Sequence, residues 1–206
     1  FHSDKGAITE SKHVFLDASS VSDKLRQGED ISVLEIGFGT GLNFFLTADE
    51  AIRSGAKLRY TALEKDLLEA HVIQELDFES YLQDSEIIKA YLEFHRALAM
   101  QIDHPIFRYK QVTLELRLGE ATEQPFIDDT YDAIYQDAFS PDANPELWTS
   151  EFFATLFNAL KVDGRLTTYS VKGDVRRALQ SVGFKVDKRP GPPGGKREML
   201  VAVKSI

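Results

Sequence analysis

The sequence predicts an α/β fold with a mostly parallel, seven-stranded sheet that is covered by helices. Three observations predict it. Short apolar and β-branched runs alternate along the chain with longer stretches of helical period. A glycine-rich turn joins the first such run to the first helix. The 206 residues contain 43% hydrophobic residues, enough for one core of ordinary size. Alternating strands and helices are typical of a parallel sheet with both faces covered.

The first strand and helix are the most informative part of the chain. Residues 31–36 form an apolar run and residues 42–52 have helical period, with Gly37, Gly39 and Gly41 between them. Glycines adopt positive φ and let the backbone approach a ligand closely. The helix that follows directs free N–H groups and a partial positive charge toward the turn. This arrangement predicts a ligand site, and the alternative is a tight turn that binds nothing.

The remaining elements follow the same alternation. Further parallel strands are expected at 58–63, 113–118, 131–135 and 165–170, and a final antiparallel pair at 184–187 and 199–203. Helices are expected at 67–76, 82–100 and 145–160, and from Asp174, as its cap, to 182. Residues 77–111 are more than one crossover helix needs. They predict a helical insertion, which either covers one edge of the site or only extends the packing.

Charge is unevenly distributed along the chain. The whole sequence has 24 basic and 33 acidic residues, whereas residues 161–206 have 11 basic and 4 acidic ones. An acidic protein is a poor general binder of nucleic acid. A local basic region can still bind one particular RNA, although chance clustering on a solvated surface is an alternative. We expect a single domain, 1–206, with an entry segment at 1–30 and a basic C-terminal part at 161–206.

Several classes of protein and site are not expected. The sequence has no run of 18 apolar residues and no charged-then-apolar leader, so neither a membrane span nor a signal peptide is predicted. Cysteine is absent, which excludes disulfides and thiolate metal sites from this chain and suits the cytoplasm. His71, His95 and His104 have no carboxylate at metal-ligand spacing, so no metal is expected.

The acid before the glycine turn indicates which ligand binds there. A dinucleotide fingerprint reads G-x-G-x-x-G, but here the spacing is G-x-G-x-G and Glu35 precedes the first glycine by two residues. An acid would repel a pyrophosphate and could accept hydrogen bonds from an ammonium or a hydroxyl. S-adenosylmethionine has an ammonium and no phosphate. The pattern resembles motif I of the class I S-adenosylmethionine-dependent methyltransferases, whose fold is Rossmann-like.

In such a sheet, ligands bind at the carboxyl ends of the strands. Glu64 ends the second strand and is expected to accept both ribose hydroxyls, unless it belongs to a solvated charge cluster with Lys65 and Asp66. Gly119 and Glu120 end the third strand, where an acid or its amides can hold the adenine amino group, or where the chain only turns. The fourth strand ends at Asp137.

Four segments, spread in order over nearly the whole chain, resemble a single family. They are FHS with Gly6, Glu10 and HVFL at 13–16; EIGFGTGLNF at 35–44; DAFSPDANPELW at 137–148; and GGKREML at 194–200. They are similar to the bacterial tRNA 5-methylaminomethyl-2-thiouridine methyltransferase family, which comprises the methyltransferase domain of MnmC and stand-alone forms. The resemblance implies cofactor contacts from the motif I residues Glu35, Gly37, Phe38, Gly39, Gly41 and Asn43.

The resemblance implies an activity and a substrate. This is methyl transfer from S-adenosylmethionine to the amine of 5-aminomethyl-(2-thio)uridine at the tRNA wobble position. The chain is similar to the stand-alone form, because it is too short for the FAD-dependent second domain and has no second nucleotide fingerprint, so FAD is not expected. Two alternatives are an enzyme of the aminopropyltransferase kind and a non-catalytic tRNA-binding module. The segments around 144–148 and 196–199 argue against the first, and the intact glycine turn with Asp137 against the second.

Asp137 is the expected catalytic residue. An alkylammonium has a pKa of roughly 10, so most of the amine arrives protonated at neutral pH. The carboxylate can accept a hydrogen bond from the amine and aim its lone pair, and secondarily take a proton. The alternative is a turn acid that caps a helix before Pro141.

Aromatic and basic residues are the expected contacts to the RNA. Phe139, Trp148, Phe38 and Phe44 are candidates to stack on the uridine or the adenine, although Trp148 and Phe44 lie on helical patterns that also suit core residues. Lys196 and Arg197 follow a glycine- and proline-rich loop and are expected to contact tRNA phosphates. Lys185, Lys188 and Arg189, just before the loop, are expected to do the same.

Overall fold

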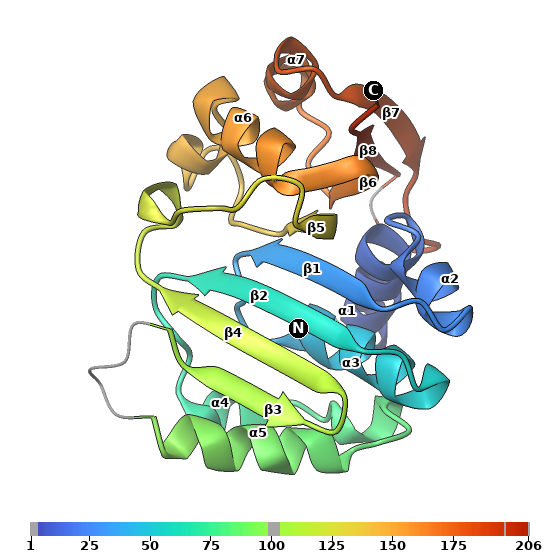
Figure 1. Cartoon of the computed structure of the whole chain (residues 1–206), viewed down its shortest axis with the longest axis vertical. Helices are drawn as coiled ribbons and strands as arrows, with labels where there is room; N and C mark the ends of the chain where they lie inside the picture. Colours follow the sequence, from blue (N-terminus) through green and yellow to red (C-terminus); the bar gives the residue numbers. More distant parts are fainter. Residues whose placement is uncertain (1–3, 99–103, 196, 206) are drawn as a thin grey trace.

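The computed structural model describes residues 4–98, 104–195 and 197–205, and is built around one eight-stranded sheet (Figure 1). The strand order is β3-β4-β2-β1-β5-β6-β8-β7. The strands are β1 (Ile31–Ile36), β2 (Leu58–Glu64), β3 (Ile106–Tyr109), β4 (Val112–Leu118), β5 (Tyr131–Gln136), β6 (Leu160–Thr168), β7 (Lys185–Pro190) and β8 (Glu198–Val203).

The middle of the sheet is parallel and its two edges are antiparallel. Strands β4, β2, β1, β5 and β6 run in one direction, with Glu35 opposite Ala62 on one side and Tyr135 on the other. Strand β3 is antiparallel to β4, and β8 is antiparallel to both β6 and β7. The chain moves outward from β1 through β2 to β4, and then returns to β5 on the other side of β1. The carboxyl ends of β1 and β5 therefore flank the switch point, where ligands bind in such sheets.

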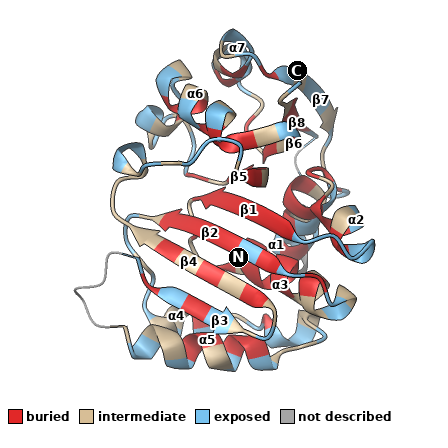
Figure 2. Ribbon diagram, viewed as in Figure 1, coloured by how far each residue is buried: buried red, intermediate tan, exposed pale blue. Residues whose placement is uncertain are grey.

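Helices cover both faces and create two apolar cores. The helices are α1 (Asp4–Ser11), α2 (Val21–Arg26), α3 (Leu42–Ser54), α4 (Ala70–Gln74), α5 (Glu86–Arg96), α6 (Ser150–Ala159) and α7 (Gly173–Ser181). A π-helical segment, η1 (Lys12–Asp17), and three 3-10 turns, η2 (Glu79–Tyr81), η3 (Ala121–Glu123) and η4 (Pro145–Trp148), join them. One core packs α1 to α3 and α5 on the sheet, and the other packs α6 and α7 on the opposite face. Figure 2 shows β1 and β2 almost wholly buried between these layers.

The α/β class and the mainly parallel sheet are confirmed, but the number of strands was wrong. The eighth strand is β3, inside the segment expected to be a helical insertion. Phe107 points into the core and Ile106 is exposed, so this short stretch has the alternation of an edge strand. It pairs with β4 across a two-residue turn in which Lys110 has φ 48°. In its described residues, the insertion thus contains η2, α5 and an antiparallel strand.

Several helix boundaries also differ from expectation, and α4 and α5 begin later than residues 67 and 82. The stretch 145–160 is divided into η4 and α6, because the Thr149 hydroxyl accepts from the Phe152 N–H at 3.1 Å and starts a new helix. Asp174 lies in the first turn of α7, where it forms an ion pair with Arg177, and the capping residue is Lys172. Among the described residues, no helix is long and apolar enough to cross a membrane.

Candidate active site

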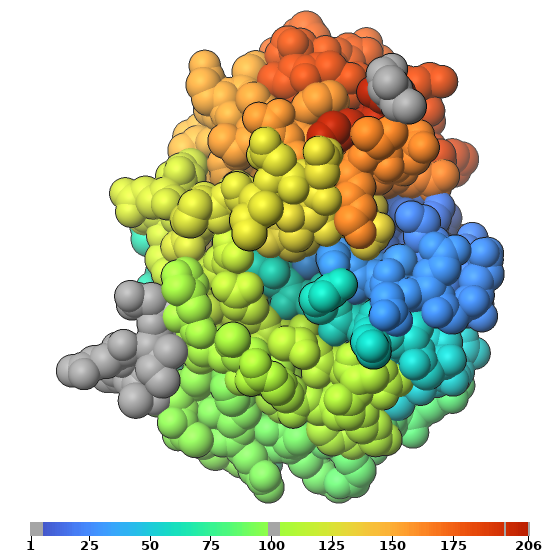
Figure 3. Space-filling model, viewed as in Figure 1, coloured from blue at the N-terminus to red at the C-terminus, as the bar shows by residue number. Residues whose placement is uncertain are grey.

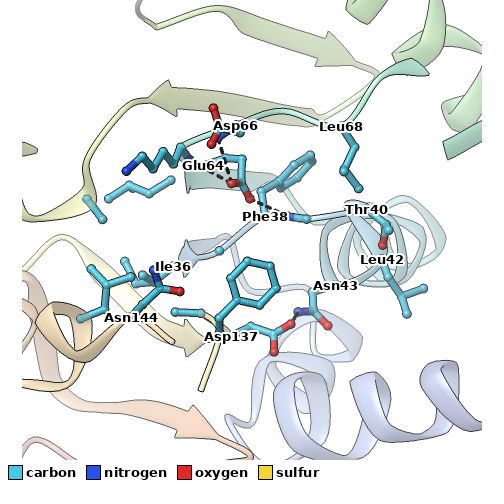
Figure 4. A pocket seen from close by; sticks show the side chains of 18 of the residues that line it. Ile36, Phe38, Thr40, Leu42, Asn43, Glu64, Asp66, Leu68, Asp137 and Asn144 are labelled. Carbon is cyan, nitrogen blue, oxygen red and sulfur yellow. Dashed lines mark hydrogen bonds between the residues drawn. The ribbon is translucent and has the colours of Figure 1, made fainter. Parts of the chain in front are cut away.

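A pocket of about 990 Å³ opens at the carboxyl ends of the parallel strands (Figure 4). Its walls come from the glycine turn after β1, from Glu64 to Asp66 after β2, from Gly119 to Ala121 after β4, and from Asp137 to Phe139 after β5. The N-terminal helix α1 contributes Glu10 and Ser11. The volume is typical of a site for a small ligand.

The charge of the pocket wall favours a cationic or neutral ligand. The charged side chains that line it are six acids and one base: Glu10, Glu64, Asp66, Glu120, Asp137, Glu146 and Lys65. The lysine forms an ion pair with Glu120. A pyrophosphate would be repelled by this wall, whereas a ligand with ammonium and sulfonium charges would be attracted.

The glycine turn is required by close approach and by backbone conformation. Gly37 has φ 88°, and a Cβ there would lie 3.0 Å from the Cα and N of Ala138 and from the Asp137 carbonyl oxygen. Gly41 has φ 78°, and its Cβ would lie 2.9 Å from the Phe38 ring. The turn after β1 can therefore pack directly against the turn after β5 only if residue 37 is glycine, and glycine at 41 lets the same turn pack against the Phe38 ring. Gly41 shapes the turn but is not a pocket-lining residue.

Glu64 ties the glycine turn to the end of β2. Its Oε2 accepts the Gly39 N–H at 2.8 Å, and its Oε1 accepts the N–H groups of Lys65 and Asp66 at 2.9 and 3.2 Å (Figure 4). The carboxylate is half-buried in the pocket wall, as the ribose prediction requires. Nearby, Gly119 continues the wall with φ 114°, and Glu120 holds Lys65. Hydrogen bonding to Glu120 and its negative charge raise the pKa of Lys65.

Asp137 and Glu35 are joined by one amide. Asn43, in the first turn of α3, donates from Nδ2 to Asp137 Oδ2 at 2.8 Å and to Glu35 Oε1 at 2.7 Å. Figure 4 shows Asn43 and Asp137 side by side at the pocket wall. Glu35 Oε2 accepts from the Tyr60 hydroxyl at 2.8 Å. Burial first, and the Asp137 charge second, raise the pKa of Glu35 well above its usual range.

Glu35 and Trp148 lie elsewhere than expected. Glu35 is 0% exposed and does not line the pocket, because its side chain points from β1 into the core beneath α3. Trp148 is 6% exposed and packs at an angle against Phe153 and Tyr169. Its indole N–H donates to the Phe139 carbonyl oxygen at 2.9 Å. Trp148 therefore supports the loop after β5 as a core residue, and the expectation that it stacks on a base is not met in this structure.

Of the other aromatic candidates, Phe44 is buried in the core and does not line the pocket, and the two that do line it differ in accessibility. Phe38 lines the pocket but is buried, and its ring packs against Phe44 and Tyr91. Phe139 also lines the pocket and is 75% exposed. Of the two, only Phe139 presents an open ring face on which a base could stack.

Basic residues at the end of β7 and just before β8 lie where these paired strands are joined. We define the basic tip as Lys188, Arg189 and Arg197, of which Lys188 pairs with Glu198 at 2.9 Å. Lys196 lies outside the described residues. The tip adjoins the N-terminal segment, since His13 Nε2 lies 2.9 Å from the Pro190 carbonyl oxygen. Burial, and then the charge of Arg189, lower the pKa of Arg165, which indicates a cluster of positive charge.

Tyr169, Glu10 and Ser11 line the pocket and were not predicted as site residues. The Tyr169 hydroxyl donates to the Ala138 carbonyl oxygen at 2.7 Å. Burial, and then the negative charges of Asp137 and Glu10, raise the pKa of Tyr169 to about 12. Its signal in the sequence was its place at the end of the fifth strand, the same rule that identified Asp137. Among the described residues, no group of three or more histidine and acidic side chains is arranged to hold a metal.

Comparisons with known proteins agree with this geometry. Residues 83–205 match a family model described as S-adenosyl-L-methionine-dependent methyltransferase. The chain is 32% identical to the bifunctional protein MnmC of tRNA 5-methylaminomethyl-2-thiouridine biosynthesis from Pseudomonas fluorescens, with 97% of this chain and 31% of that protein aligned. It is 34% identical to the MnmC protein of Cupriavidus metallidurans, over 98% of this chain and 31% of that protein. The chain thus spans about a third of the length of these relatives.

Solved structures give the same result. The crystal structure of MNMC2 from Aquifex aeolicus aligns with a TM-score of 0.77 and 28% identity, over 97% of this chain and 61% of that chain. A second methyltransferase from Aquifex aeolicus, 16% identical with a TM-score of 0.53, shares the fold. The resemblance seen in the sequence is confirmed. The chain belongs to the S-adenosyl-L-methionine-dependent methyltransferase family, and its cofactor is S-adenosylmethionine.

Proposed function

We propose that this chain transfers a methyl group from S-adenosylmethionine to the amine of 5-aminomethyl-(2-thio)uridine at the wobble position of tRNA. The observation that carries the proposal is Asp137, held by Asn43 on the wall of an acidic pocket at the switch point of the sheet. An acidic wall suits a substrate amine that arrives as a cation. The MnmC relatives, whose names place them in this biosynthesis, support the choice of substrate.

The pocket residues fit the cofactor. S-adenosylmethionine, when bound, supplies a methyl group activated by its sulfonium. We assign Gly37, Phe38 and Gly39 to its contact with the turn after β1, because these residues line the pocket and a Cβ at Gly39 would lie in open space that a ligand can occupy. Glu64 already accepts the N–H groups of Gly39, Lys65 and Asp66, and would accept a ribose hydroxyl on its remaining lone pair. Gly119 and Glu120, next in the wall, would hold the adenine.

Asp137 would handle the amine. A protonated amine cannot act as a nucleophile, and the ordinary pKa of an alkylammonium is roughly 10. A carboxylate at hydrogen-bond distance can accept an N–H and direct the remaining lone pair, and can take the excess proton toward solvent. Glu10 and Tyr169 line the same part of the pocket and interact electrostatically with each other. Together these side chains form a surface that favours a cation over a neutral alcohol.

Phe139 and the basic tip would hold the RNA. An enzyme that acts on a base in a loop must expose it and hold it by stacking. Phe139 offers an exposed ring on the rim of the pocket. The basic tip is linked through His13 to the segment that contributes Glu10 and Ser11 to the pocket. Phosphates bound there would lie on the side of the molecule where the pocket opens. A tRNA substrate would place the reaction in the cytoplasm.

Methyl transfer to defined tRNAs tests the proposal. The chain is incubated with S-adenosylmethionine carrying a labelled methyl group and with tRNA that bears 5-aminomethyl-2-thiouridine. The tRNA is then digested and its nucleosides are separated. We expect label in 5-methylaminomethyl-2-thiouridine and nowhere else. The matched control is the same tRNA with unmodified uridine at the wobble position, which should take no label.

Other outcomes separate the alternatives. If label appears in unmodified tRNA, the amine is not the acceptor and the role of the acidic wall is wrong. If the cofactor binds by calorimetry and no tRNA is labelled, the tRNA substrate is wrong. If calorimetry detects no cofactor binding, the assignment of the pocket is wrong.

A further inference from the structure

Asn43 joins two carboxylates that belong to different strands. Its two amide hydrogens point to Glu35 Oε1 on β1 and Asp137 Oδ2 on β5, at 2.7 and 2.8 Å. Its Oδ1 accepts from the Ser11 hydroxyl of α1. A carboxylate oxygen accepts hydrogen bonds, and so does the carbonyl oxygen of a protonated carboxyl group, so the amide can present its NH₂ group to both acids. One side chain thus connects α1, α3 and the two central strands at the switch point.

Glu35 is held in place by burial and by a second hydrogen bond. It is fully buried, and its second oxygen accepts from the Tyr60 hydroxyl at 2.8 Å. Tyr60 is itself buried on β2, and packs edge-on against Phe44 and Tyr135. Both oxygens of Glu35 therefore have donors within the protein, and the side chain does not reach the pocket. A fixed acceptor at this point permits one orientation of the Asn43 amide.

Asp137, in contrast, lies on the pocket wall and is only partly buried. A carboxylate on two rotatable bonds, facing a pocket, can adopt several orientations. The bond from Asn43 holds its Oδ2 toward the first turn of α3. In a transfer between two bound groups, a displacement of about 1 Å can reduce the rate roughly 100-fold.

We propose that Asn43 is a positioning residue for Asp137, and that Glu35 is the positioning residue that orients Asn43. This reassigns both from direct contact with the cofactor to support of the group that handles the amine. The inference rests on the proposed function, since it explains how Asp137 is aimed. The arrangement of the three side chains, however, does not depend on the identity of the substrate.

Three variants separate this role from a direct cofactor contact. In Asn43→Ala the hydrogen bond to Asp137 is removed, and we expect turnover to fall about 10- to 100-fold while the Kd for the cofactor changes less than about threefold. Glu35→Leu should resemble Asn43→Ala. Glu35→Gln should restore most of the turnover that Glu35→Leu loses, because a glutamine can accept from Asn43 through Oε1 and donate to the Tyr60 oxygen through Nε2.

Thr47→Val is the matched control for a general effect on packing. Thr47 lies one turn along α3, where its hydroxyl donates to the Asn43 carbonyl oxygen at 2.7 Å and does not touch the amide. The variant removes a buried hydroxyl from the same region without changing shape, so it should lower stability and leave turnover near the wild-type value. If Thr47→Val lowers turnover as much as Asn43→Ala, the effect is one of packing and the proposal is wrong.

Crystal structures with S-adenosylmethionine give a readout besides activity. In the wild-type protein Asn43 Nδ2 should lie within hydrogen-bond distance of both carboxylates, and in Asn43→Ala the Asp137 carboxylate should move or lose its single orientation. An Asp137 that keeps its position in Asn43→Ala would overturn the proposal. So would a Glu35→Gln protein that binds the cofactor more than about 10-fold more weakly, since that identifies Glu35 as a cofactor ligand. A wild-type protein that fails to methylate the tRNA refutes the proposed function alone, because the structures still decide the network.

Discussion

The pocket wall and the basic tip are built on opposite principles. On the wall, Asp137 is held by Asn43, and Asn43 by Glu35, through hydrogen bonds of 2.7 to 2.8 Å. On the tip, Lys188 and Arg197 are exposed; Lys188 lies on the edge strand β7, and Arg197 comes just before its antiparallel partner β8. The hydrogen-bonded wall indicates that the reaction depends on fixed geometry. The exposed charges of the tip indicate that attraction of a polyanion depends on the number of charges. Substitutions in the two regions should therefore differ in kind.

The largest effect is expected on the wall. Asp137→Ala removes the group that orients the amine, so turnover should fall by about 10²- to 10⁴-fold. The Kd for S-adenosylmethionine should change little, because the cofactor contacts we assign lie on other strands. Single-turnover rates and calorimetry measure the two quantities separately. Unchanged turnover with intact cofactor binding would remove Asp137 from the mechanism.

At the tip, neutralisation should affect binding and not the chemical step. In the triple variant of Lys188, Arg189 and Arg197 to Gln, KM for tRNA should rise roughly 10-fold or more, with kcat within about twofold. The slope of log affinity against log salt should become shallower by about 1 for each phosphate that no longer pairs with a cation of the protein. Filter binding over a range of salt concentrations measures the slope.

A control variant with the same change in net charge distinguishes a local effect of the tip from an effect of overall charge. Lys89 and Arg96 on α5 and Arg108 on β3 lie at the end of the molecule opposite to the C-terminal strands (Figures 1 and 3). Their replacement by Gln changes net charge by the same amount. If this control weakens tRNA binding as much as the tip variant does, then overall charge governs binding and the tip is not the surface that binds the RNA.

Phe139 should affect the binding of tRNA, because its exposed ring lies at the pocket. Loss of one base–aromatic stack costs about 1–3 kcal/mol, so Phe139→Ala should raise KM for tRNA about 5- to 150-fold. The melting temperature should hardly change, since the ring is 75% exposed. Phe139→Trp should retain the affinity. A loss of stability without a change in KM would indicate that the ring only packs.

The elements with strong patterns were predictable. The run 31–36 became β1 with the expected bounds, and Glu64 and Asp137 were found by reading each parallel strand at its carboxyl end. The rule works because parallel strands bring their carboxyl ends to one edge of the sheet. The same rule, applied at the fifth strand, would also have identified Tyr169.

Other features depend on contacts that no local pattern reports. Strand β3 is four residues long and follows a segment whose aromatic residues resemble a helix face. Its place at the edge is decided by pairing with β4 and by Phe107, whose ring packs against Tyr91 at 5.6 Å. The link from Glu35 to Asp137 spans about 100 residues of sequence and passes through a side chain on a third element. From the sequence, Glu35 could be recognised as important, but not as buried behind the wall.

The smallest effect on activity, and a distinct effect on stability, is expected for Glu35→Gln. Burial, then the charge of Asp137, raise the pKa of Glu35 in the folded protein, and the hydrogen bonds from Asn43 and Tyr60 oppose this. The nearby Glu64 charge raises it slightly further. The folded state therefore binds a proton more tightly at Glu35 than the unfolded chain does. Stability should fall as pH rises from the ordinary glutamate pKa, about 4.3, through the raised folded value.

Glutamine carries no charge, so the variant should lose this part of the pH dependence. Its melting temperature should exceed that of the wild type at pH 8 and approach it at pH 5. Thermal unfolding of both proteins from pH 5 to pH 8 measures the difference between the two curves. Parallel curves would mean that Glu35 titrates equally in the folded and unfolded states, which its complete burial between β1 and α3 argues against. A glutamine that is less stable at every pH would mean that the amide cannot replace the carboxylate as the acceptor for Asn43. Asp137 would then be expected to lose its support at the same time.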